Sequence, residues 1–326
     1  MSKKIALPLA ALALASLIAA APQTASHRST FLPPNNLKHR IGAADSAGIT
    51  EAQFNAVMDR MQAVYGPIIA ARGATLQINR LWTDDTVNAS AEQQGGTWIL
   101  NMYGGLARDK NVTEDGMALV ACHEMGHHLG GAPKYGGMNW AANEGGADYF
   151  ATSKCAHRIL ADAWPAPVAT LSNHDDVALI ATACAKAYGK AGAQAVCNRT
   201  GAAGMSLANL LTSLGGEQPP HIDTPDASVV SATNDEHPAG QCRLDTYFQG
   251  ALCTKDWHID PSDTDATVGA CVLSQGYTVG MRPFCWYKPG ANELAGPSIA
   301  ASMEKQSHAA ASSTLASLNG DVFAGQ

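Results

Sequence analysis

Residues 120–130 read Val-Ala-Cys-His-Glu-Met-Gly-His-His-Leu-Gly, an apolar stretch that carries three histidines and a glutamate. In an α-helix, His123 and His127 are about 400° of turn apart and project from one face, close enough to bind a single metal ion. Glu124 lies on the flank of that pair, where its carboxylate can meet a water on the metal without binding the metal itself. The HExxH pattern therefore predicts a hydrolytic zinc site. The alternative is a core helix whose histidines are hydrogen-bonded within the protein.

A catalytic zinc needs a third protein ligand and leaves its fourth position to water. A metzincin would place a third histidine where this chain has Pro133, so that class is disfavoured. Glu144 begins a second helical segment 17 residues after His127, enough chain for a loop that lays this helix against the first. Asp148 lies one turn further on the same face, where it can orient a ligating histidine. The alternative is that both acids are ordinary helix N-terminal residues, which the helix dipole favours.

Further blocks in a fixed order extend this pattern over residues 87–243. They are Val87-Asn88-Ala89-Ser90-Ala91 with Gly95-Gly96 and the strand 97–103, the segment Glu144-Gly145-Gly146-Ala147-Asp148, and His237-Pro238 with Arg243. Together with the HExxH helix, these blocks resemble the HtpX/CAAX prenyl protease family of zinc metallopeptidases, gluzincins that include soluble periplasmic members. The chain departs from that family in a shorter gap between the ligand helices and in lacking its transmembrane helices. The stretch 155–235 and the cysteine-rich C-terminal region have no counterpart in the family.

The expected activity is that of a metalloendopeptidase that hydrolyses extended or unfolded polypeptide. One Zn²⁺ per chain would be bound by His123, His127 and Glu144, with Glu124 as the general base. The resemblance implies that His237 stabilises the oxyanion of the intermediate, and that Arg243 supports the loop or the intermediate.

The strand 97–103 could present its edge to a substrate strand, which predicts that four of its residues bind substrate. These residues are Trp98, Ile99, Leu100 and Asn101. Two alternatives to a peptidase remain open. One is an exported zinc-binding protein that assists assembly and uses the metal structurally, and the other is an amidase that cleaves cell-wall peptide bonds.

The predicted fold class is α+β and mainly helical, with a zincin-like core in which a small antiparallel sheet packs on the HExxH helix. The expected organisation begins with a signal peptide at 1–21, with the cleavage site between 19 and 25, and a flexible arm at 22–47. A metallopeptidase domain at 48–254 follows, with a helical insertion at about 155–235. The chain then continues as a cysteine-containing extension at 255–290 and an Ala/Ser-rich tail at 291–326.

The chain has a net charge of −7, from 28 acidic and 21 basic residues. This balance argues against nucleic acid or an anionic membrane surface as the main partner. Lys3 and Lys4 precede an Ala/Leu run that is typical of a secretory signal peptide, and no later apolar run is long enough to span a bilayer. The expected protein is periplasmic or extracellular, without stable membrane insertion, and its oligomeric state stays open.

Eight cysteines in a chain expected to be exported predict a disulfide framework. They are Cys122, Cys155, Cys184, Cys197, Cys242, Cys253, Cys271 and Cys285. A bridge between Cys122 and Cys155 could brace the two metal-binding helices, and Cys184 and Cys197 could close a helical hairpin. In one continuous helix, Cys242 and Cys253 would be about 16 Å apart, too far for a bridge, so each would need a partner elsewhere, for which Cys271 and Cys285 are candidates. A four-cysteine zinc site is disfavoured because no CxxC spacing occurs.

Overall fold

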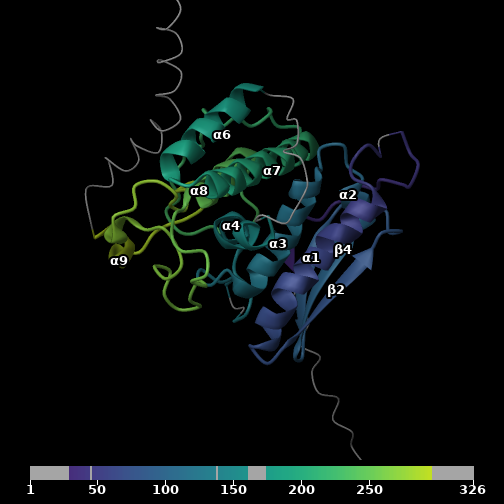
Figure 1. Cartoon of the computed structure of the whole chain (residues 1–326), viewed down its shortest axis with the longest axis horizontal. Helices are drawn as coiled ribbons and strands as arrows, with labels where there is room; N and C mark the ends of the chain where they lie inside the picture. Colours follow the sequence, from purple (N-terminus) through teal and green to yellow (C-terminus); the bar gives the residue numbers. More distant parts are fainter. Residues whose placement is uncertain (1–28, 45, 137–138, 161–173, 296–326) are drawn as a thin grey trace, which may run out of the picture.

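The computed structural model describes residues 29–44, 46–136, 139–160 and 174–295. The expected signal peptide at 1–21 lies outside these residues, as does the expected tail beyond residue 295. Within the described ranges the protein is mixed α/β and mainly helical, with a small four-stranded sheet. Figure 1 shows α1 running along β2, with α3 beside it, and α7 packs against α3.

The sheet has the strand order β1-β3-β4-β2. Its strands are β1 (Ser29–Thr30), β2 (Thr75–Leu81), β3 (Ala89–Gln94) and β4 (Thr97–Tyr103). β3 and β4 form the expected hairpin, whose tight turn uses a positive φ at Gly95. The prediction of an antiparallel sheet is wrong for β2, which pairs in parallel with β4. The alternating sequence of β2 identifies a strand but does not show which strand it pairs with. Since β3 takes one edge of β4, β2 pairs along the other edge.

Helix α1 (Glu51–Ala70) begins at a capping box. Gln53 N donates to Thr50 Oγ1 at 3.3 Å, and Thr50 N donates to Gln53 Oε1 at 2.9 Å, so two donors at the helix start are satisfied. The apolar residues at helical spacing form one buried face: Phe54, Val57, Met58, Met61, Tyr65 and Ile69. This face packs on β2 and α3.

The first four described residues of the expected flexible arm, 29–32, are packed against the protein, whereas most of the described residues between 33 and 47 are exposed. Ser29 and Thr30 pair with β3, and Phe31 and Leu32 are buried in the main core. The side chain of Asn88 accepts a hydrogen bond from Leu32 N at 2.9 Å and donates one to Leu32 O at 3.1 Å. Phe31 and Leu32 are apolar residues in an otherwise Pro- and Ser-rich segment, and their burial stabilises this part of the chain on the core.

Helix α3 (Glu114–Leu129) is central, as the sequence predicts, and contacts β3, β4, α1 and α7. Thr113 caps it by accepting a hydrogen bond from Gly116 N at 3.0 Å. Asp115 in the first turn makes two hydrogen bonds to Arg199 of α7 (Ala191–Gly215), at 2.7 and 2.9 Å. Because α3 is enclosed on almost every side, it is a fixed support for the polar residues near its end.

The chain after α3 turns back into α4 (Glu144–Phe150), which continues through a π-helical turn at Ala151–Cys155 into α5 (Ala156–Ile159). The Asn143 side chain caps α4 by accepting from Gly146 N at 2.9 Å. Helices α6 (His174–Ala187) and α7 form the expected hairpin, and α8 (Gly240–Leu252) packs on α7 and α4.

Four disulfides join the eight cysteines, and each agrees with the pairing options expected from the sequence. The bridges are Cys122–Cys155, Cys184–Cys197, Cys242–Cys285 and Cys253–Cys271. The first joins α3 to the π-helical turn after α4, so it braces the two helices that carry the predicted ligands. Such a framework is typical of proteins that fold in an oxidising compartment. None of the helices in the described ranges has both the length and the apolar composition that a membrane span requires.

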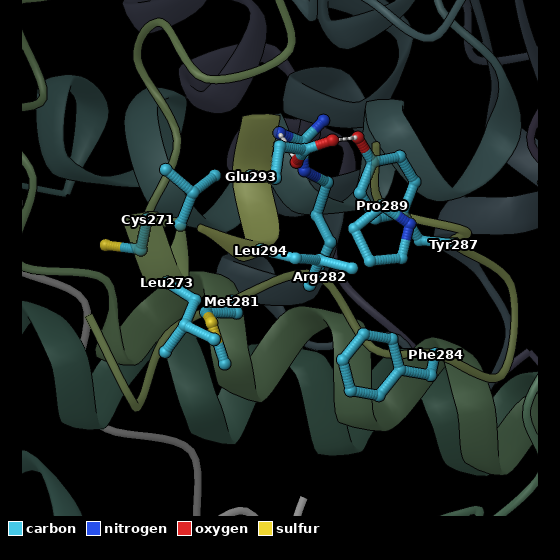
Figure 2. A pocket seen from close by; sticks show the side chains of 10 residues that line it. Cys271, Leu273, Met281, Arg282, Phe284, Tyr287, Pro289, Glu293 and Leu294 are labelled. Carbon is cyan, nitrogen blue, oxygen red and sulfur yellow. Dashed lines mark hydrogen bonds and ion pairs between the residues drawn. The ribbon is translucent and has the colours of Figure 1, made fainter. Parts of the chain in front are cut away.

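The extension after α8 folds back over α4 and ends in the short helix α9 (Ala291–Leu294). Its carboxylate Glu293 accepts a hydrogen bond from Tyr287 Oη at 2.6 Å and faces Arg282, as Figure 2 shows for this small apolar pocket. Tyr149 of α4 donates to Gly280 O at 2.6 Å. The extension is therefore attached to the helix that carries the predicted third ligand.

A buried acid in α8 makes stability depend on pH. The Asp245 carboxylate accepts hydrogen bonds from Asp226 N and Gln241 Nε2, but burial raises its pKa to about 7. An unfolded aspartate has a pKa of about 3.9, so the folded state holds this proton more tightly and the free energy of unfolding falls as pH rises from about 4 to about 7. The loss is at most about 4 kcal/mol. We expect Asp245→Asn to gain stability over the wild type as pH rises, measured by urea unfolding at pH 4.5 and 7.5. An equal difference at both pH values would contradict this assignment.

Candidate metal centre

The metal centre forms where α3 and α4 approach closely. A Cβ on Gly126 would lie 2.7 Å from Ala147 O, so only a glycine at this place in the HExxH segment lets α4 pack so near. The contact sets Glu144, the first residue of α4, opposite His123 and His127 of α3. All three side chains are completely buried.

The three predicted ligands lie together at the spacing that a metal requires. His123 Nε2 is 3.1 Å from His127 Nε2 and 3.2 Å from Glu144 Oε2, and His127 Nε2 is 3.8 Å from Glu144 Oε1. A tetrahedral zinc with bonds of about 2.0–2.1 Å separates its ligand atoms by about 3.3–3.4 Å. The group His123, His127 and Glu144 can therefore hold a metal ion, and its donor set of two imidazoles and a carboxylate suits Zn²⁺.

Both histidines are oriented through their second ring nitrogen. His127 Nδ1 donates to Ala142 O at 2.8 Å, and because a carbonyl only accepts, Nε2 keeps its lone pair for the metal. His123 Nδ1 donates to Asp148 Oδ1 at 2.7 Å, with the same result for its Nε2. Asp148 thus lies where the sequence analysis expected a carboxylate that orients a ligand.

Electrostatics favour an ionised Glu144 in this cluster. Burial alone would raise the pKa of its carboxyl, but His127, His123 and His237 outweigh burial and hold the pKa well below its usual range. Burial also disfavours the charged form of His123, but Asp148 and Glu144 outweigh it and raise the pKa of His123 to about 9. For His127 burial dominates and lowers the pKa to about 4. Without metal, these pKa values leave a positive charge on His123 at neutral pH, and a bound metal ion would replace that charge.

Arg243 is a fully buried partner of Asp148. Its Nε donates to Asp148 Oδ2 at 2.7 Å and its second terminal nitrogen donates to Asp148 Oδ1 at 2.8 Å. The remaining terminal nitrogen donates to Phe31 O at 2.8 Å. Burial alone would raise the pKa of Asp148, but Arg243 and His123 reverse that effect and lower it. Arg243 therefore supports a metal ligand through Asp148. Its expected support of the loop or the intermediate stays a prediction.

Three residues that support or enter the centre were missed by the sequence analysis. Tyr135, in the loop between the ligand helices, donates to Glu144 Oε1 at 2.6 Å. Trp286, from the extension, packs against Gly145 so closely that a Cβ there would lie 2.2 Å from its ring. Ser29 lies with its Oγ 3.1 Å from His127 Nε2 and 3.0 Å from Glu144 Oε1. Only Tyr135 had a recognisable feature, namely a phenol in the loop that must reverse the chain.

Of the two predicted catalytic residues, His237 lies at the metal centre, and Glu124 lies next to a ligand in the sequence. Glu124 follows His123 on α3 and is completely buried. His237 Nε2 lies 3.5 Å from Glu144 Oε2 and donates to Thr30 O at 2.7 Å. Burial lowers the pKa of His237, so its imidazole is neutral at pH 7 with a hydrogen on Nε2. The downstream histidine is thus brought to the metal centre from a part of the chain far away in sequence.

The expected substrate edge on the strand 97–103 is wrong. β4 is paired on both sides, with β3 and with β2, so its backbone groups have no room for a substrate strand. Leu100 and Ile99 are core residues, and Asn101 donates to Ser90 Oγ at 3.1 Å. Trp98 stacks on His128 with ring centroids 5.1 Å apart. The hairpin pattern predicted β4 correctly but could not show that β2 covers its second edge.

Comparisons with protein-family models, with curated proteins and with solved structures each give no match to this chain. What defines the site is its geometry, a buried group of two histidines and one glutamate that can hold a metal ion. The family suggested by the separated motifs stays a prediction.

Removal of the third ligand tests the metal site. Glu144→Gln keeps the size of the side chain but loses its charge, so we expect at least a hundredfold weaker zinc binding, measured by metal content after dialysis against a competing chelator. Glu293→Gln is the matched control, because Glu293 is also a buried glutamate but pairs with Arg282 and Tyr287. Full zinc content in the Glu144 variant would exclude this residue as a ligand.

Proposed function

We propose that the protein is an exported, zinc-dependent metalloendopeptidase with a zincin-like core, related to the HtpX/CAAX prenyl protease family. The observation that carries the proposal is the meeting of His123, His127 and Glu144 from two helices at metal-ligand spacing, beside the glutamate of an HExxH segment. A structural zinc usually has four protein ligands, whereas three ligands and an adjacent carboxylate are typical of a hydrolytic site.

Each residue has a distinct task in this proposal. Zinc, when bound, supplies a water of lowered pKa and polarises the carbonyl of the scissile peptide bond. Glu124 accepts the proton of that water and later donates it to the leaving amine. His237 is neutral with a hydrogen on Nε2, so it can donate to the oxygen that becomes negative in the transition state. Arg243 and Asp148 keep His123 in its ligating orientation.

The substrate in this proposal is extended polypeptide. The metal ligands are enclosed by α3, α4 and β1, so a compact protein surface does not reach them and a single strand of polypeptide fits better. A groove with a volume of about 380 Å³ adjoins His237 and Arg243. Its wall includes Leu32, Pro33, Leu211, Leu214 and Pro238, which suit an apolar side chain of the substrate.

Two features support export: the four disulfides, and Lys3 and Lys4 followed by an Ala/Leu run. We place the protein in the periplasm or outside the cell on these grounds.

The test is turnover of two substrate classes by the zinc-loaded protein. We expect cleavage of unfolded casein that stops with a zinc chelator and returns with added Zn²⁺. Isolated cell wall is assayed in parallel. Consumption of cell wall alone would replace the endopeptidase with an amidase, and consumption of neither, at full zinc content, would favour a structural role for the metal.

A further inference from the structure

The N-terminal strand β1 passes directly through the proposed active site. Its Ser29 hydroxyl touches two metal ligands, His127 and Glu144, and its Thr30 carbonyl accepts the hydrogen bond of His237. We propose that Ser29 and Thr30 occupy the place of a substrate strand, so that the folded chain is latent until this strand leaves. The inference rests on the proposed function, because it concerns regulation of the same site.

The position of β1 on the sheet is that of an added peptide. It pairs antiparallel with β3, with Ser29 opposite Ala91 and Thr30 opposite Ser90. The other edge of β3 is taken by β4, so β1 covers the edge of β3 that faces the metal centre. Phe31 N donates to Ala89 O at 3.1 Å. Since backbone groups alternate in direction along a strand, those of Thr30 point away from β3, which is how its carbonyl reaches His237.

The contacts made by Ser29 explain why this strand blocks the site without being cut. Its Oγ lies 3.0–3.1 Å from ligand atoms of Glu144 and His127, close to the separation between two ligands of one metal. With a metal bound by His123, His127 and Glu144, this hydroxyl would stand where hydrolysis requires a water. The carbonyl of Thr30 accepts the hydrogen bond of His237. A side chain in the place of the water makes β1 an inhibitor.

Release of β1 does not require the core to open. Phe31 is completely buried, and Leu32 is held at both backbone groups by Asn88, so the chain is anchored from residue 31 onward. Ser29 and Thr30 lie on the N-terminal side of that anchor and can swing away from β3. Because they are tethered directly beside the site, their effective concentration is in the millimolar range or above, and micromolar peptide does not displace them.

A reversible lock tests whether β1 must leave. The cross-strand pair Thr30 and Ser90 lies at a position without backbone hydrogen bonds between the two residues, where Cα atoms are about 4.5 Å apart and a disulfide can form. The variant Thr30→Cys/Ser90→Cys is prepared with zinc and with Glu124→Gln, so that a bound peptide is not cleaved. A fluorescent peptide that copies residues 24–30 is titrated to millimolar concentration and followed by anisotropy. We expect no binding when the lock is oxidised and wild-type binding after mild reduction, with the parent chain treated in parallel. Equal binding in both states would overturn the proposal.

A second pair of variants weakens β1 without a lock. In the same Glu124→Gln background, Ser29→Ala loses the hydroxyl contacts and should bind the peptide about tenfold more tightly than the parent. Ser29→Pro also cannot donate a backbone hydrogen bond to β3 and should bind still more tightly. Ser206→Ala is the matched control, because Ser206 and Ser29 are both 3 % exposed and Ser206 lies on α7, outside the centre. Unchanged affinity in both Ser29 variants, with their thermal midpoints and zinc content intact, would also overturn the proposal.

Activity separates this inference from the proposed function. In chains that retain Glu124, the oxidised lock should abolish casein cleavage and Ser29→Ala should raise it about tenfold. Equal cleavage by locked and unlocked chains would refute latency and leave the peptidase standing. If the peptide binds only when the lock is reduced, but the chains that retain Glu124 hydrolyse no substrate, the peptidase proposal is refuted. β1 would then occupy a binding site that has no hydrolytic activity.

Discussion

Glu124→Gln is expected to abolish hydrolysis while the protein keeps its zinc. The substitution preserves the shape of the side chain but removes the group that accepts the proton of water, which contributes roughly 10²–10⁴-fold to catalysis. We therefore expect kcat on unfolded casein to fall about a thousandfold, with little change in KM. Zinc content should stay at one ion per chain, because Glu124 is not among the three side chains that converge at metal-ligand spacing.

The matched control for this prediction is Glu114→Gln, the same chemical change on the same helix. Glu114 lies in the first turn of α3 and contacts Gln53, far along the helix from the ligands. It should retain wild-type activity and zinc. Cleavage by the Glu124 variant at the wild-type rate would rule out the proposed base, and loss of its zinc would indicate that Glu124 acts on the metal site itself.

The largest expected loss of stability follows from Arg243→Met. Arg243 is completely buried, makes two hydrogen bonds to Asp148 and a third to Phe31 O, and its guanidinium carbon lies 4.6 Å from the centre of the Phe31 ring. Methionine fills much of the volume of the arginine side chain but removes its positive charge. The buried carboxylate of Asp148 then keeps His123 as its remaining partner of opposite charge. Breaking such a pair costs about 3–5 kcal/mol. We expect a loss of that size in the free energy of unfolding, measured with urea, together with weaker zinc binding.

An exposed ion pair provides the control. Arg80 lies 2.7 Å from Asp59, whose side chain is 69 % exposed, and Arg80→Met should change stability by less than about 1 kcal/mol. The double variant Arg243→Met/Asp148→Asn should recover part of the loss, because it removes the unpaired buried charge as well. A loss for Arg243→Met no larger than that of the exposed control would show that this pair does not stabilise the fold.

Local patterns predicted what depends on neighbours in sequence. The helix that carries HExxH, and Asp148 one turn after Glu144, follow from helical spacing, and the structure has both as expected. The disulfide options followed from the reach of a helix and a hairpin, and the observed bridges lie among them.

Contacts set by tertiary packing could not be predicted in this way. Ser29 lies 98 residues before His127 in the chain, and nothing in a Pro- and Ser-rich segment marks its hydroxyl as a neighbour of metal ligands. The position of β2 beside β4 depends on how the connection crosses the sheet. Trp286 lies against Gly145 because the extension folds back, and neither residue type reveals the other.

The contact between Trp286 and Gly145 also bears on the order in which the molecule is completed during synthesis. Glu144 precedes Gly145 directly, and the buried indole of Trp286 packs against Gly145. The next residue toward the N-terminus, Cys285, is bonded to Cys242 on α8. A nascent chain that has not reached residue 286 thus has both histidines and the glutamate but lacks the indole that packs beside the glutamate's helix. The most C-terminal part of the described chain finishes a site whose ligands were translated well over a hundred residues earlier.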